Sequence, residues 1–169
     1  MTAARGIRRV APICLIVAVC QLVRGKLQFS REYLGKTIVM HDGQQFTVFR
    51  HMNLRIKNID FDDSPTIFVV RFKFAKLSYK INRILSCIPI PFIAGSPGFR
   101  DKIWMVNEKN GYWQGIYQWD TVRCAEDYKD SFVLSMMTKR AIPETVSYKT
   151  VLNTWLEDCM SARSGAEDS

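Results

Sequence analysis

The residues best able to support chemistry are aromatic side chains on two stretches that alternate like strands. Trp113, Tyr117 and Trp119 share one face of the second stretch, and Trp104 lies on the first. Such side chains can wall a dry pocket for an aromatic molecule, although a stripe at period two is more often core or dimer interface. Both interpretations are open at this point.

Arg71 is the least ordinary polar residue of the chain. It lies in residues 66–75, TIFVVRFKFA, where Phe68 and Phe72 share one face and Arg71 lies on the other. A guanidinium directed at a sheet interior needs an anionic partner. Asn107 is a second polar candidate, but it borders a predicted turn and can serve the turn alone.

The histidines and cysteines predict no metal site. His41 flanks a predicted turn and His51 lies near the end of a predicted strand, with Asp42 nearby and no third ligand in position. The cysteines are odd in number and lack a Cys-x-x-Cys pair, which argues against both a disulfide framework and zinc. We interpret them as reduced thiols in a cytosol-like compartment: Cys14, Cys20, Cys87, Cys124 and Cys159.

The net charge of +8 is concentrated at one end of the chain. Residues 1–34 hold six Lys and Arg and one acidic residue, so they carry +5 of that charge. A protein that binds duplex nucleic acid gathers its cations on a folded face or a recognition helix. We therefore expect no nucleic-acid partner.

Residues 10–23, VAPICLIVAVCQLV, form an apolar run flanked by basic residues. The run has the length of a signal-peptide core and is short of the roughly 20 residues that cross a membrane, and no small-residue cleavage site follows it. Our first interpretation is an anchor on the cytoplasmic side of a membrane, with a membrane or membrane-protein partner along residues 7–24. A helix covered by a partner and a mitochondrial-type presequence are the alternatives.

The other elements predict one α+β domain with appendages. Asp42-Gly43 between two β-rich runs indicates an N-terminal β-hairpin over residues 36–54, joined by a linker at 58–65 to the main domain. The predicted order of elements in the main domain is β-α-β-β-α-β, the ferredoxin-like arrangement. The predicted organisation is a basic and apolar segment at 1–34, the hairpin and linker at 35–64, the main domain at 65–151 and a C-terminal tail at 152–169.

Ser78 is the predicted N-cap of the first helix of the main domain. The stretch that follows, IPIPFIAGSPG at 88–98, is predicted to be an apolar connection whose Phe92 and neighbouring isoleucines line a pocket, cover a sheet edge or meet a partner. The second helix is predicted to begin at Asp120 or Thr121 and to run on to Lys139.

Short motifs in residues 65–151 resemble the antibiotic-biosynthesis-monooxygenase-like family of the dimeric α+β barrel superfamily, in particular its monooxygenase-like branch. Each motif is weak alone, and their order and spacing carry the resemblance. The motifs are PGF at 97–99, KIW at 102–104, NE at 107–108, GIY at 115–117 with Trp119, AEDY at 125–128 and PETVSY at 143–148.

The resemblance implies a homodimer with a pocket between each sheet and its helices. It implies a cofactor-independent monooxygenase, an oxidoreductase that acts on an aromatic or quinone-like small molecule whose enolate or phenolate supplies the electrons. A non-catalytic ligand-binding protein and a membrane-tethered accessory subunit on the same fold are the alternatives. The candidate residues are Arg71, Asn107 and Tyr117 for catalysis, and Trp104, Trp113, Trp119, Tyr128 and Phe92 for substrate binding.

Overall fold

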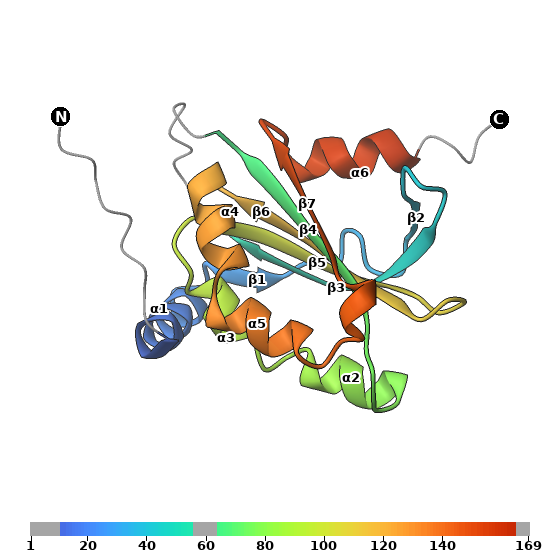
Figure 1. The fold of residues 1–169 in the computed structure, drawn as a ribbon. Coiled ribbons are helices and arrows are strands. Elements are labelled where there is room, and N and C mark those ends of the chain that lie inside the picture. The colour runs from blue at the N-terminus through green and yellow to red at the C-terminus, as the bar shows by residue number, and fades with distance from the viewer. Residues whose placement is uncertain (1–10, 56–63, 165–169) are drawn as a thin grey trace.

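A computed structural model describes residues 11–55 and 64–164, and its centre is a seven-stranded antiparallel sheet (Figure 1). The order across the sheet is β1-β3-β5-β6-β4-β7, and β2 pairs with the first residues of β3. The strands are β1 (Leu27–Phe29), β2 (Thr37–Val39), β3 (Gln45–Leu54), β4 (Thr66–Lys73), β5 (Phe99–Asn107), β6 (Tyr112–Trp119) and β7 (Ser147–Leu152).

The chain is α+β, as predicted, and its sheet is compatible with a ferredoxin-like arrangement. β5 and β6 are consecutive and adjacent, whereas β4 lies between β6 and β7, so that the helical connections cross over the sheet. The N-terminal strands extend this unit through the pairing of β3 with β5. The predicted linker at 58–65 lies largely outside the described residues.

Most helices lie on one face of the sheet, and α6 lies on the other (Figure 1). Side-chain hydroxyls cap three of them, because Ser78, Thr121 and Ser131 each accept a hydrogen bond from a backbone N–H of the first helical turn. The helices are α1 (Ala11–Val23), α2 (Tyr79–Leu85), α3 (Ile90–Ala94), α4 (Val122–Lys129), α5 (Phe132–Thr138) and α6 (Leu156–Ser164), with a 3-10 turn at Pro143–Thr145.

Three helical features differ from the sequence-based prediction. The apolar connection contains α3, because Pro91 occupies the first turn, where its missing N–H costs nothing. The long second helix is divided into α4 and α5 at Asp130, because Ser131 caps a new helix. The tail contains α6, whose Leu156 and Met160 are buried.

The two faces of the sheet carry different cores. Along β4, Phe68, Val70 and Phe72 enter an aromatic-rich core beneath α1 to α5, as the alternation predicts. Ile67 enters an aliphatic core on the opposite face, together with Met160 of α6. The strands therefore present one aromatic and one aliphatic surface, and the helices divide between them.

The prediction of a membrane anchor is not supported. Within residues 11–55 and 64–164, no helix has both the length and the apolar character needed to cross a membrane. α1 instead lies against α3, with the small side chains of Cys14 and Ala18 buried between the helices. The approach is so close that a Cβ added to Gly95 would lie 1.9 Å from the backbone oxygen of Cys14.

The homodimer stays a prediction, because the structure describes a single chain. β7 is an edge strand whose outer side is unpaired, and most of its residues are exposed. α6 and β2 cover part of the aliphatic face. A dimer through the sheets would therefore use the β7 edge or the part of this face that α6 leaves open.

We expect Gly95→Val to destabilise the protein by about 1–3 kcal/mol, because the added side chain must push α1 away from α3. Thermal or urea unfolding followed by circular dichroism measures this loss. Val19→Phe adds comparable bulk to the outward side of α1, where Val19 is exposed, and should leave stability within about 0.5 kcal/mol of the parent. Equal stability of the parent and Gly95→Val would contradict the packing of α1 on α3.

Candidate functional site

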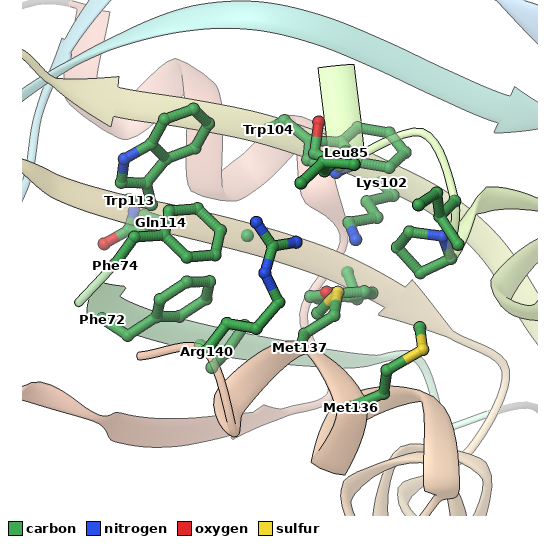
Figure 2. Close-up of a pocket in the computed structure, with 16 residues that line it drawn as sticks. Phe72, Phe74, Leu85, Lys102, Trp104, Trp113, Gln114, Met136, Met137 and Arg140 are labelled. Carbon is green, nitrogen blue, oxygen red and sulfur yellow. The ribbon is translucent and has the colours of Figure 1, made fainter. Parts of the chain in front are cut away.

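A cavity of about 260 Å³ lies between the aromatic face of the sheet and the helices (Figure 2). Its walls are mainly aromatic and aliphatic, and within residues 11–55 and 64–164 the only charged side chains that line it are those of Lys102 and Arg140. β4, β5 and β6 form its floor, and α5 and the segment that joins α2 to α3 form its sides. The lining residues are Val70, Phe72, Phe74, Leu85, Ser86, Ile88, Pro89, Lys102, Trp104, Trp113, Gln114, Gly115, Tyr117, Met136, Met137 and Arg140.

The strand register creates the space. Gly115 of β6 lies opposite Trp104 of β5 on one side and Val70 of β4 on the other, so a residue without a side chain is set among large ones. The ring of Tyr117 covers part of this gap, and a Cβ on Gly115 would lie 2.8 Å from its Cε2 atom. The cavity therefore depends on the absence of a side chain at position 115.

Lys102 is the most unusual residue of the cavity. It lies on β5 directly opposite Tyr117 of β6 and is 1% exposed. Its Nζ is 4.2 Å from the ring centroids of both Trp104 and Tyr117, and it points into the cavity in Figure 2. Among the residues that the structure describes, no carboxylate lines the cavity, so the amine has no acidic partner there of the kind that a buried lysine usually has.

Burial lowers the pKa of Lys102 well below its usual value, because the ammonium form loses its hydration. The nearby guanidinium of Arg50 lowers that pKa further. The two ring faces give the ammonium form a smaller, opposing stabilisation. Compared with an exposed lysine, the amine is therefore shifted toward its neutral form, which can accept a proton from a bound molecule.

Arg140 supplies a second cation from the segment that follows α5 (Figure 2). One of its N–H groups donates to Oδ1 of Asn82 at 2.6 Å, and its guanidinium carbon is 4.9 Å from the ring centroid of Phe74. A guanidinium has five N–H donors, so others are available to the cavity. The described lining of the cavity thus combines aromatic walls with two basic groups and no acid.

At one end of the cavity floor, the position of Tyr117 is fixed by a second buried tyrosine, Tyr128. The Tyr128 hydroxyl donates to the Tyr117 hydroxyl at 3.0 Å, and burial raises the pKa of both groups. Both side chains therefore stay protonated, and neither is a base. Because Tyr128 itself does not line the cavity, its effect on a ligand acts through the position of Tyr117.

The structure brings three of the sequence-predicted residues together in the cavity: Trp104, Trp113 and Tyr117. Arg71 lies on the opposite face of the sheet, because it alternates with Val70 and Phe72 along β4. It forms a salt bridge with Asp42 and donates from Nε to Oε1 of Gln114 at 2.8 Å. The expected anionic partner of Arg71 is thus a carboxylate of the protein.

The other predicted residues have structural surroundings. Asn107 accepts hydrogen bonds from the backbone N–H groups of Lys109 and Asn110 and so holds the β5–β6 turn. Trp119 is fully buried in the aromatic core. Phe92 of α3 is half-buried against the same core and does not line the cavity.

Sequence reasoning missed Lys102 and Arg140. The signal for Lys102 was its alternation with Trp104, which places an amine on the aromatic face of a central strand. Arg140 gave no comparable signal, because it follows the end of a helix and reaches the cavity only through the path of the chain after α5. Neither histidine lies in this site: His51 pairs with Asp101 at 2.9 Å, and His41 is in the turn between β2 and β3.

Comparison with known proteins leaves this chain without a family. No family model matches the sequence, and no curated protein does. A solved structure described as an anthrone oxidase-like protein aligns with 64% of this chain at 19% identity and a TM-score of 0.39, and this chain spans about half of that protein, 52%. A likeness at these values does not indicate what this chain does.

The buried amine predicts a pH-dependent stability difference. The folded-state pKa of Lys102 lies below the unfolded-state value of about 10.4. Between these two pKa values the unfolded chain binds the extra proton, so stability falls as pH falls. We expect Lys102→Met to be more stable than the parent at pH 8, and its advantage should shrink toward pH 10 by up to about 1.4 kcal/mol per pH unit.

Urea unfolding at several pH values measures this difference. The exposed Lys139 gives the matched control, and Lys139→Met should differ from the parent by the same amount at pH 8 and pH 10. A pH-independent difference for Lys102→Met would mean that the amine keeps its charge in the folded protein, held by the faces of Trp104 and Tyr117.

Proposed function

We propose that the chain is a monooxygenase-like oxidoreductase that binds a small, acidic aromatic molecule in this cavity, with Lys102 as the base. The observation that carries the proposal is the buried Lys102 amine, which lies near two aromatic rings in a cavity whose described lining holds no carboxylate. A neutral amine in such a place can take the proton of a phenol or enol. The resulting ammonium then stabilises the anion beside it.

The size of the cavity limits the substrate. Benzene fits an engineered protein cavity of about 150 Å³, so about 260 Å³ suits an aromatic of one or two rings. The walls offer ring faces for stacking, chiefly from Trp104 and Trp113. Arg140 fits a second acidic or carbonyl oxygen at the other side of the ring system, because a guanidinium binds such oxygens strongly.

The proposed reaction takes its electrons from the substrate. Lys102 removes the hydroxyl proton, and the electron-rich ring carbon of the anion reacts with O₂ to form a carbon–oxygen bond, which gives a hydroperoxide once a proton is added. Loss of the remaining hydrogen of that carbon and cleavage of the O–O bond then leave a carbonyl and release water. One oxygen atom enters the product and the other leaves as water, so a phenol becomes a quinone and no further reductant is required.

The chemistry also explains why the cavity is largely apolar. A dry site strengthens the attraction between the Lys102 ammonium and the anion, and it protects the reactive carbanion from protonation by water. Tyr117, held by Tyr128, bounds one end of the site and can donate its hydroxyl hydrogen to an oxygen of the substrate.

We expect 2-naphthol to bind in the cavity and naphthalene, its apolar counterpart, to bind more weakly. Loss of the charged hydrogen bond in Lys102→Met should weaken 2-naphthol binding roughly ten- to a hundredfold and leave naphthalene binding nearly unchanged. Isothermal titration calorimetry measures both affinities. If the parent binds neither compound, or if Lys102→Met weakens both equally, Lys102 does not bind the acidic group.

We expect oxygen consumption with a two-ring phenol or quinol, measured with an oxygen electrode. Loss of the base in Lys102→Met should lower kcat by roughly 10²- to 10⁴-fold. Arg71→Gln tests whether the catalytic cation is Lys102, as the structure indicates, or Arg71, as the sequence predicted. Because Arg71 lies on the opposite face of the sheet, its loss should change kcat less than about threefold. Binding without oxygen consumption would favour the non-catalytic ligand-binding alternative.

A further inference from the structure

Two helical segments carry most of the exposed apolar side chains of the described structure. Ten of the fifteen large apolar residues that are exposed belong to α1 or to residues 77–88, and exposure reaches 81% at Val23 and 69% at Ile84. We call this set the α1–α2 face. Its residues are Ile13, Leu15, Ile16, Val19, Leu22 and Val23 of α1, and Leu77, Ile81, Ile84 and Ile88 in and around α2.

The two segments lie on the same side of the molecule. α1 contacts α3, and α3 follows α2 after a short connection. In Figure 1 these helices lie along the lower side of the molecule, and α6 lies at the opposite side. A monomeric protein rarely leaves so many large apolar side chains of two helical segments in water, which points to an occupant.

The charges of the same segments indicate what the occupant is. Residues 11–31 and 64–100 contain no aspartate or glutamate, although the chain has 16 acidic residues. Exposed cations border the apolar residues, namely Arg24 and Lys26 after α1, and Lys76, Lys80 and Arg83 at α2. Segments that are apolar, basic and free of acidic residues complement a bilayer with anionic headgroups.

We propose that the α1–α2 face docks on the surface of an anionic lipid bilayer, with α1 in the plane of the interface. α1 has 13 residues and its Cys14 and Ala18 are buried against the protein, so it can enter only the outer layer of the membrane. Its exposed isoleucine, leucine and valine side chains would enter the acyl boundary, and the cations would meet the phosphates.

The docked orientation has a consequence for the cavity. Ile88 belongs both to the α1–α2 face and to the cavity lining, and Leu85 and Pro89 line the cavity beside it. The cavity would therefore open near the lipid, so an apolar aromatic molecule dissolved in the bilayer could enter without crossing bulk water. This consequence rests on the proposed function, whereas the docking itself does not.

Co-sedimentation of the full chain with vesicles tests the docking. We expect the parent to bind phosphatidylcholine vesicles that contain 30% phosphatidylglycerol and to bind pure phosphatidylcholine at least about tenfold more weakly. The triple variant Ile16→Ser, Val19→Ser and Leu22→Ser should lose binding by more than about tenfold, as should the variant Arg24→Gln with Lys26→Gln. All five positions are exposed, so the variants should fold like the parent, which circular dichroism checks.

Two matched controls lie away from this face. Leu152→Ser removes an apolar side chain that is 54% exposed on β7, and Lys149→Gln removes an exposed charge from the same strand. Both should bind vesicles like the parent. Equal binding of the parent to neutral and anionic vesicles, or equal losses in the controls, would overturn the proposal. So would a parent that ignores vesicles but forms a dimer, measured by light scattering, that the triple variant dissociates.

Discussion

The pairing register of β6 with its two neighbours is the constraint on which the candidate site depends. It sets Lys102 opposite Tyr117, and Gly115 between Trp104 and Val70. A shift of β6 by one residue would turn its own side chains, including that of Tyr117, to the other face of the sheet. The cavity, the buried amine and the aromatic walls therefore arise together from one set of backbone hydrogen bonds, and the helices above the sheet only complete the enclosure.

The two faces of the sheet each hold a cationic side chain, and its surroundings differ between the faces. On the aliphatic face, Arg71 is satisfied by Asp42 and Gln114, so its charge is already neutralised within the protein. On the aromatic face, Lys102 has ring faces and, among the described residues, no carboxylate beside it, so its amine can interact with a molecule that enters the cavity. A cation is thus structural on one face, where Arg71 is half-buried, and available for chemistry on the other, where Lys102 is buried.

α1 shows how a strongly apolar segment can be only partly satisfied by its own protein. Its small residues allow a close approach to Gly95, the C-cap of α3, and this approach buries Cys14 and Ala18. The larger side chains of the same helix point away from the protein and stay exposed. The helix is therefore held by small-residue contacts, and its remaining surface can bind something other than the protein.

The local sequence pattern determined which side chains share a strand face and where two of the helices begin. The alternation along residues 66–75 and 112–119 predicted which side chains share a face, and the capping residues Ser78 and Thr121 marked helix starts, because side-chain period and cap hydrogen bonds are local properties. Only the tertiary structure decided which face holds a cavity, because that depends on what each face packs against. The tertiary structure placed Arg71 beside Asp42, which is distant in sequence. It also brought Arg140 into the lining of the cavity on the aromatic face, and it packed α6 on the other face.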